Sequence, residues 1–420
     1  MDYRRPLLAA TLGNAIEYYD NALFGLLAAF LARAFFDFKD PNTALLATYA
    51  TFITSYAIRP VAGLLLGRLA DLHGHRSVLI LTINLMTLGT FCIGLLPTYS
   101  AVGIWSPLLL VLCRAMQGIG ASAEFTVATS YALEHGPANR QHYLVGWCIA
   151  ATNLGPLIAS LVAIMATWAY GDAFFRSGAW RVPFLLSAPI GLLAFYLRTQ
   201  IKEDGLLHSR SAADKKFARV PLFLALRGHW STVAKVIALG AGQRVGTFCI
   251  QTYFLTALIR HGFGASMAMF ASILICLIGA PANVLGGLLA DKIGGRHVLI
   301  GGFAIYAAVT VPLFSVLGIS VPLAILGIVI CSLMNNIVAP PLSHAYIMSF
   351  PRAVRGAAAA LNFNVGTALI GATAPLFATF LVARTGSEVA FGWYMAALCL
   401  VSFATAAVAY PRQLDRGAAE

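Results

Sequence analysis

Twelve stretches of about twenty mostly apolar residues follow one another along the chain. A helix that crosses a bilayer needs roughly 20 such residues, whereas the strands of a membrane barrel are only about half as long. Only helices and closed barrels satisfy their backbone hydrogen bonds in lipid. The runs therefore predict an all-α membrane protein with twelve transmembrane helices, at 8–31, 44–67, 77–96, 107–133, 143–168, 182–198, 233–258, 266–289, 297–316, 321–346, 356–383 and 389–410.

The composition supports this reading, because only 10% of the residues are charged, against about a quarter in soluble domains. All seven cysteines fall within predicted spans, which favours buried packing over disulfides or a metal site. We find no metal-ligand cluster, no phosphate-binding loop and no plausible Ser-His-Asp set. We therefore expect no metal, no cofactor and no enzymatic activity.

The net charge of +12 reflects the predicted topology more than a partner. If the N-terminus is cytoplasmic, nineteen of the 28 Lys and Arg residues lie on the inner side, six lie outside and three lie within spans. Positive residues concentrate on the cytoplasmic side of membrane proteins. We therefore expect a multi-pass protein of the bacterial inner membrane, monomeric, with both termini in the cytoplasm. We expect a lipid bilayer to surround the protein, and we do not expect it to bind nucleic acid.

A decapeptide between spans two and three, GRLADLHGHR (67–76), returns between spans eight and nine as GLLADKIGGR (287–296). The repeat predicts two parallel six-helix bundles, 1–198 and 231–420, joined by a polar cytoplasmic linker at 199–230. Its acid stands at the C-terminal end of a helix, where the dipole disfavours an anion, so it needs another helix N-terminus or an arginine as partner. The second glycine permits a tight reversal. The residues of this motif are Gly67, Asp71, Gly74 and Arg76 in the first copy and Gly287, Asp291, Gly294 and Arg296 in the second.

The pattern G-x-L-A-D-x-x-G-x-R, present twice over twelve spans, resembles the loop motif of the major facilitator superfamily. The first half is similar to the metabolite:H⁺ symporters, which include carriers of proline and betaine, citrate, 2-oxoglutarate and shikimate. This second resemblance rests on GNAIEYYDNALFG (13–25), FF and DP within 35–41, IRP and Gly within 58–63, GLLPTYSAVGIWSPLLLVLCRAMQG (94–118) and Glu124. It covers 10–200 well, whereas the second half matches mainly through its motif copy and span count.

This resemblance implies the major facilitator fold and proton-coupled transport that alternates between outward-open and inward-open states around a midplane site. It also implies that the loop motif latches the cytoplasmic side. Four positions are carried over as functional: Glu17, Asp20, Arg59 and Glu124. At the last of these, the family's usual Gly-Gly-Glu reads Ser122-Ala123-Glu124.

Six ionisable side chains lie deep within the predicted spans, and three are acids and three are arginines: Glu17, Asp20, Arg59, Arg114, Glu124 and Arg244. Insertion of one charge near a helix centre costs about 2.5–3.5 kcal/mol, so six unpaired charges would cost about 15–20 kcal/mol. These groups must therefore pair with one another or face a hydrated cavity.

Helical spacing sorts these groups into three polar stripes, since residues three, four or seven apart share a face. The stripes contain Glu17 and Asp20 in span one, Arg114, Gln117 and Glu124 in span four, and Arg244, Thr247 and Gln251 in span seven. We expect the three acids to carry the proton, because no histidine lies at mid-depth. The expected substrate-binding residues are Arg59, Arg114, Gln117, Arg244, Thr247, Gln251, Asn336, Asn362 and Tyr18.

Arg244 has three alternative roles: it clamps a substrate carboxylate, it forms a salt bridge between the halves with Glu17 or Asp20, or it is purely structural. The preferred function is a secondary transporter that couples proton entry to the import of a small organic acid or zwitterion. The alternatives are a proton-driven exporter, suggested by Gly155-Pro156 in span five, and a nutrient sensor that does not transport.

Overall fold

The computed structural model describes residues 17–66, 75–171, 178–199, 229–350 and 355–410, apart from Leu64 and several positions between 123 and 136. Every regular element in these ranges is helical, and helices follow the predicted spans within a few residues at most ends. Six helical segments are each long and apolar enough to cross a membrane: 141–170, 267–293, 295–316, 321–348, 358–385 and 389–409. The expected spans 233–258, 77–96 and 182–198 correspond to a bent helix pair and two shorter apolar helices.

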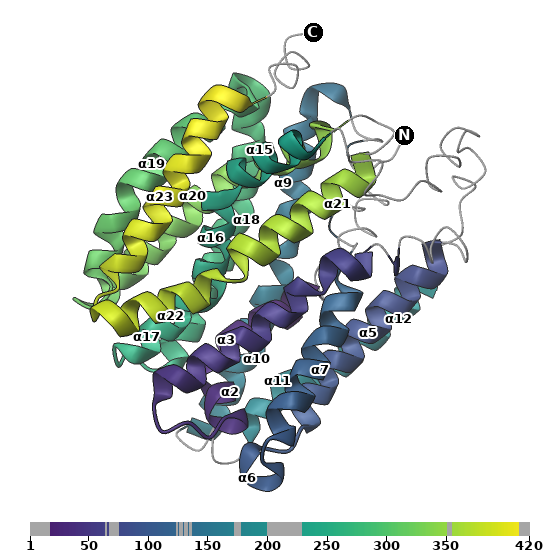
Figure 1. The fold of residues 1–420 in the computed structure, drawn as a ribbon, viewed down its shortest axis with the longest axis vertical. Coiled ribbons are helices and arrows are strands. Elements are labelled where there is room, and N and C mark those ends of the chain that lie inside the picture. Colours follow the sequence, from purple (N-terminus) through teal and green to yellow (C-terminus); the bar gives the residue numbers. More distant parts are fainter. Residues whose placement is uncertain are drawn as a thin grey trace.

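The first-half helices are drawn from purple to blue-green in Figure 1. After a helical segment at 17–26 they are α2 (Ala28–Phe35), α3 (Pro41–Ala57), α5 (His75–Leu95), α6 (Tyr99–Val102), α7 (Trp105–Gly120), α9 (Gln141–Thr152), α10 (Leu154–Tyr170), α11 (Val182–Leu185) and α12 (Ser187–Thr199). The predicted linker lies almost wholly outside the described residues, so the predicted domain boundaries stay predictions.

The second-half helices run from green to yellow. They are α15 (Trp230–Leu239), α16 (Ala241–Phe248), the π-helical η5 (Cys249–Tyr253), α17 (Phe254–Arg260), α18 (Ala265–Ile293), α19 (Gly295–Val316), α20 (Val321–Met348), α21 (Arg355–Gly366), the π-helical η6 (Thr367–Gly371), α22 (Ala374–Thr385) and α23 (Val389–Ala409). Two of the expected spans, the seventh and the eleventh, include π-helical geometry. The seventh also bends by 49° between α15 and α16.

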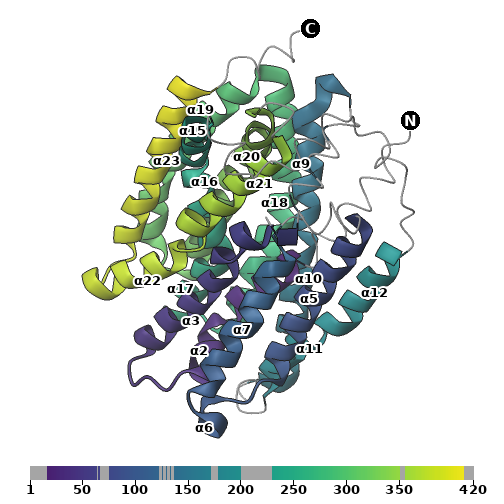
Figure 2. The same ribbon diagram turned by 45° about the vertical axis from the view of Figure 1, so that its right-hand side comes forward.

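The two halves meet along two seams, which Figures 1 and 2 show from different sides. On one seam α9 and α10 pack against α18, and on the other α3 packs against η6 and α22. Glycines allow the first seam to close, as small residues do between membrane helices. A Cβ atom at Gly146 would lie 2.7 Å from the carbonyl oxygen of Asn283, and one at Gly287 would overlap the carbonyl of His142. The first glycine of the repeated motif therefore brings α18 against the other half.

Following the predicted topology, we call the end of the molecule that contains α6 and the turn between α22 and α23 the outer end. The opposite end, where α19 begins and α23 finishes, is the inner end (Figure 1).

Candidate functional site

The first predicted pair of charges forms within the first half. Arg59 Nη1 donates to Glu17 Oε1 at 2.6 Å, and the two side chains are 3% and 5% exposed. The guanidinium carbon of Arg59 also lies 4.1 Å from the centre of the Tyr56 ring. Arg59 lies two residues beyond the end of α3, and Glu17 lies at the start of the described first helix. This ion pair removes two of the isolated charges that the sequence placed in the membrane.

Arg114, on α7, is fully buried but lacks a comparable ion pair. Its Nη1 donates to Gln117 Oε1 at 2.7 Å, and Gln117 in turn donates to Thr90 Oγ1 at 2.6 Å. The guanidinium carbon stands 4.4 Å from the Phe24 ring centre and 4.9 Å from that of Phe52. Its Nε and Nη2 have no hydrogen-bond partner among the described residues. Arg114 therefore keeps donor capacity for another group.

Asp20 is the acid whose charge interacts with Arg114. It is 3% exposed and lies beside Thr90 and within electrostatic range of Arg114 and Glu17. Within the part of the chain that the structure describes, neither carboxylate oxygen accepts a geometrically acceptable hydrogen bond, and no ion pair within 4 Å involves it. A buried carboxyl without a direct donor is costly when ionised, so this position suits a group that gains and loses a proton.

Arg244, on α16, has all of its described partners in its own half. Its guanidinium donates to the carbonyl oxygen of Ile237 at 3.0 Å and to Asn362 Oδ1 at 3.2 Å, and it lies 4.5 Å from the Tyr346 ring centre. No ion pair within 4 Å joins it to Glu17 or Asp20 among the described residues. In this conformation the proposed salt bridge between the halves is therefore not formed, and Nε of Arg244 remains without a partner.

An aromatic contact connects the two arginine clusters, of which one contains Arg59 and Arg114 in the first half and the other contains Arg244 with its partners in the second half. Phe248 lies one turn beyond Arg244, and its ring centre is 5.9 Å from that of Phe52 and 5.0 Å from that of Tyr56, both edge-on. Phe52 also covers Arg114, so a continuous path of packed side chains runs from Arg114 to α16. The sequence analysis did not select Phe248, because an apolar aromatic in an apolar span gives no signal of its own.

The neutral polar residues that were predicted to bind substrate do not gather at one place in the structure. Thr247 accepts from Asn335 at 3.0 Å, close to Arg244 in sequence but with different partners. Gln251 lies within η5, where the π-helical geometry breaks the α-helical spacing on which the predicted stripe depended. Asn336 accepts from Asn283 at 2.8 Å, and Tyr18 is half-buried. Asn362 alone of the predicted asparagines binds an arginine directly.

The second copy of the loop motif joins the halves at the inner end. Asp291, near the end of α18, accepts from the backbone amides of His142 and Tyr143 at 3.0 and 2.9 Å, at the start of α9. The partner of this acid is therefore a helix N-terminus, the first of the two alternatives. Gly294 has φ +91°, as the tight reversal requires, and Arg296 donates to the carbonyls of Ala406 and Ala407.

Part of the predicted site lies outside the described residues: Glu124, Gly67, Asp71 and Gly74, together with the side chain of Arg76. Within the described part of the chain no group of three or more His, Cys, Asp or Glu residues could hold a metal ion.

Comparisons with known proteins show the family to which the chain belongs. The family model of the Major Facilitator Superfamily matches residues 10–375. The chain is 28% identical to the proline/betaine transporter of Salmonella typhimurium, covering 96% of this chain and 82% of that one. It is 30% identical to the alpha-ketoglutarate permease of Escherichia coli, covering 96% and 93%.

Among solved structures, the xylose transporter XylE of E. coli in a partially occluded inward-open conformation is similar with a TM-score of 0.78. The similarity covers 96% of this chain and 97% of that one at 17% identity, and at that identity it concerns the fold alone.

Proposed function

Since this chain belongs to the major facilitator superfamily, we propose that it couples the entry of protons to the import of a small organic acid or zwitterion. The chain is a multi-pass secondary transporter of small metabolites and not an enzyme. The observation that carries this proposal is Asp20, a buried acid that forms no ion pair among the described residues and lies beside Thr90, in electrostatic range of an arginine with open donor positions.

Coupling follows from competition for Arg114. When Asp20 is ionised, the guanidinium is its nearest charge of opposite sign. When Asp20 takes up a proton, that attraction is lost, and the open Nε and Nη2 of Arg114 become available to a carboxylate of the solute. Binding of a proton and binding of an anion then favour each other, which is the requirement for symport.

The charge balance favours an anion as the solute. Glu17 neutralises Arg59, whereas Arg114 and Arg244 each keep donor atoms without partners among the described residues. Protonation of Asp20 leaves these two arginines uncompensated in a buried environment. The candidate solutes are therefore organic acids such as 2-oxoglutarate first, and proline or betaine second, which are the compounds named for the relatives.

We also propose that the protein works by alternating access, that it is a monomer and that both of its termini lie in the cytoplasm. Both arginine clusters belong to one chain and are connected through Phe52 and Phe248, so one copy can enclose a solute. The excess of Lys and Arg on one side supports the orientation.

Uptake into proteoliposomes tests this function. We expect radiolabelled 2-oxoglutarate, proline or betaine to accumulate when the outside is acidic and to equilibrate without accumulation when the pH gradient is collapsed.

Arg244→Ala should lower anion uptake by at least tenfold, whereas Arg384→Ala, which changes an outer-end arginine that lies over Phe380, should leave it unchanged. Undiminished anion transport by Arg244→Ala would remove its role as a clamp. Absence of any gradient dependence would refute proton coupling, and absence of flux would favour the sensor.

A further inference from the structure

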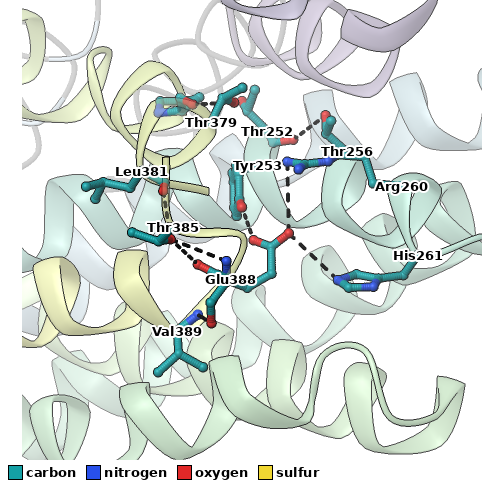
Figure 3. A network of polar contacts seen from close by, with 12 residues as sticks. Thr252, Tyr253, Thr256, Arg260, His261, Thr379, Leu381, Thr385, Glu388 and Val389 are labelled. Carbon is teal, nitrogen blue, oxygen red and sulfur yellow. Dashed lines mark hydrogen bonds and ion pairs between the residues drawn. The ribbon is translucent and has the colours of Figure 1, made fainter. Parts of the chain in front are cut away.

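A polar network at the outer end surrounds Glu388, in the turn between α22 and α23 (Figure 3). Tyr253, the last residue of η5, donates its hydroxyl to Glu388 Oε2. Arg260 Nη1 and His261 Nε2, at the end of α17, lie 3.9 and 3.7 Å from Oε1. The Glu388 side chain is only 10% exposed. Sequence analysis did not select it, because it falls in a short polar turn.

These two basic side chains, Arg260 and His261, compensate the charge of this carboxylate incompletely. Both stand beyond hydrogen-bond distance, and their side chains are about one-third exposed, at 29% and 33%. Arg384, in the last turn of α22, is a further arginine at this end of the molecule. It lies over the ring of Phe380 and forms no ion pair with Glu388 among the described residues. Burial therefore dominates and raises the pKa of Glu388 to about 7.

A cavity of about 320 Å³ gives this group access to solvent. Its lining includes Arg260, His261 and Glu388, together with Phe314 and Ser315 of α19, which bring no further titratable group. A space of this size with several polar groups can hold ordered water, so a proton can reach the carboxylate from outside.

The network also adjoins the contact that closes the outer end between the halves. Tyr49 on α3 and Thr256 on α17 share a hydrogen bond of 2.8 Å, one turn from Tyr253 and one turn from Arg260. A Cβ atom at Gly25 would lie 2.8 Å from Thr252 Oγ1, so the first helix also touches this segment closely. The residues that hold Glu388 thus stand on the helix that contacts the first half.

From this placement we propose that Glu388 is an external proton-binding site that controls whether the outer end of α17 stays packed against α23 and against the first half. The proton here is separate from the one carried at Asp20. The control acts on the conformation, whichever solute is transported.

The direction of the pH effect follows from linkage. Glu388 titrates near pH 7 when buried and near its ordinary value of about 4.3 when exposed to water, so proton binding favours the buried arrangement. The stabilisation of the closed outer end is fully present below about pH 4 and is lost as the pH rises through about 7. External acidification therefore closes the outer side.

Distances between two spin labels, measured by double electron–electron resonance without substrate, test this inference. Labels at Trp105→Cys, at the start of α7, and Ile319→Cys, in the turn after α19, report the outer separation of the halves, because both positions are exposed. In the parent we expect the short-distance population to fall as the pH rises from about 4 and to level off above about 7, with a midpoint at or somewhat below 7. Glu388→Gln, which cannot ionise, should keep the short distance at every pH.

Three variants serve as comparisons. Asp37→Asn removes an exposed acid elsewhere at the outer end and should keep the midpoint. His261→Gln should also retain a pH response, which separates the carboxyl from the imidazole. Tyr253→Phe removes the donor to the carboxylate and should raise the midpoint by about one pH unit.

A parent distance that does not depend on pH would overturn the proposal, as would a titration that survives in Glu388→Gln or disappears in His261→Gln. Should Glu388→Gln fail to fold, an unshifted midpoint in Tyr253→Phe would overturn it equally.

Discussion

Individual buried charges differ in what surrounds them, and that difference separates structural from functional groups. Glu17 and Arg59 have each other at 2.6 Å. Arg114 and Arg244 are equally buried, yet each keeps at least one donor without a partner among the described residues. An unpaired buried donor costs free energy, and under the proposed function a ligand satisfies it during the transport cycle.

The Glu17–Arg59 pair should behave as a unit. Arg59→Met leaves Glu17 buried without its cation, and we expect it to lower the free energy of unfolding by about 3–5 kcal/mol. The double variant Glu17→Gln/Arg59→Met should recover most of that loss, because no uncompensated charge remains. Denaturation in mixed micelles measures both. A double variant as unstable as the single one would contradict the pairing.

The position of Arg244 depends on a glycine opposite it. A Cβ atom at Gly366 would lie 2.5 Å from the guanidinium carbon, so Gly366→Ala must displace the arginine. We expect at least a tenfold lower uptake rate from this one methyl group. Gly301→Ala is the matched control, since its Cβ would meet nothing within 4 Å, and it should transport normally. Equal rates for the two variants would mean that the position of Arg244 is unimportant.

At the scale of helices, the ends and interruptions matter more than the spans. The C-terminal end of α18 carries Asp291, which binds the first amides of α9 in the other half. An anion at a helix N-terminus stabilises the contact, by up to about 2 kcal/mol when partly buried. This contact joins the halves through one carboxylate, two backbone amides and Nδ1 of His142, which lies 2.9 Å from Asp291 Oδ1, and we propose that it holds the inner end closed.

Removal of that carboxylate should open the inner end. With spin labels at Asn139→Cys and Val408→Cys, both exposed at the inner end, we expect Asp291→Ala to shift the ratio of open to closed molecules by about tenfold toward open. Lys292→Ala, which alters the exposed neighbouring residue, should leave the distance distribution unchanged. An unaltered distribution in Asp291→Ala would show that another contact closes the inner end.

Sequence patterns predicted the spans well and their internal breaks poorly. Apolar length and the repeated decapeptide sufficed for twelve helices and the major facilitator fold. The π-helical segment η5 has no hydropathy signal, so the predicted stripe of Arg244, Thr247 and Gln251 assumed α-helical spacing where it does not hold. The partners of Arg244 are likewise more than a hundred residues away or backbone carbonyls, which no local spacing reveals.

At the scale of the whole molecule, the halves touch at the outer end, the middle and the inner end. Tyr49 binds Thr256, Phe248 packs on Phe52 and Tyr56, and Asp291 caps α9. Alternating access requires the outer and inner contacts to open at different times while the middle moves with the solute. The arginine clusters lie on either side of the middle contact, so binding there can bias which end opens.

The central claim is that the ionised carboxylate of Asp20 and the solute compete for Arg114, so that proton binding at Asp20 and solute binding favour each other. The most direct test compares Asp20→Asn with the parent in proteoliposomes loaded with the transported solute. We expect the variant to lose accumulation driven by a pH gradient while it still exchanges internal for external solute, because its neutral side chain mimics the protonated state. Accumulation in Asp20→Asn that matches the parent under the same gradient would contradict the claim.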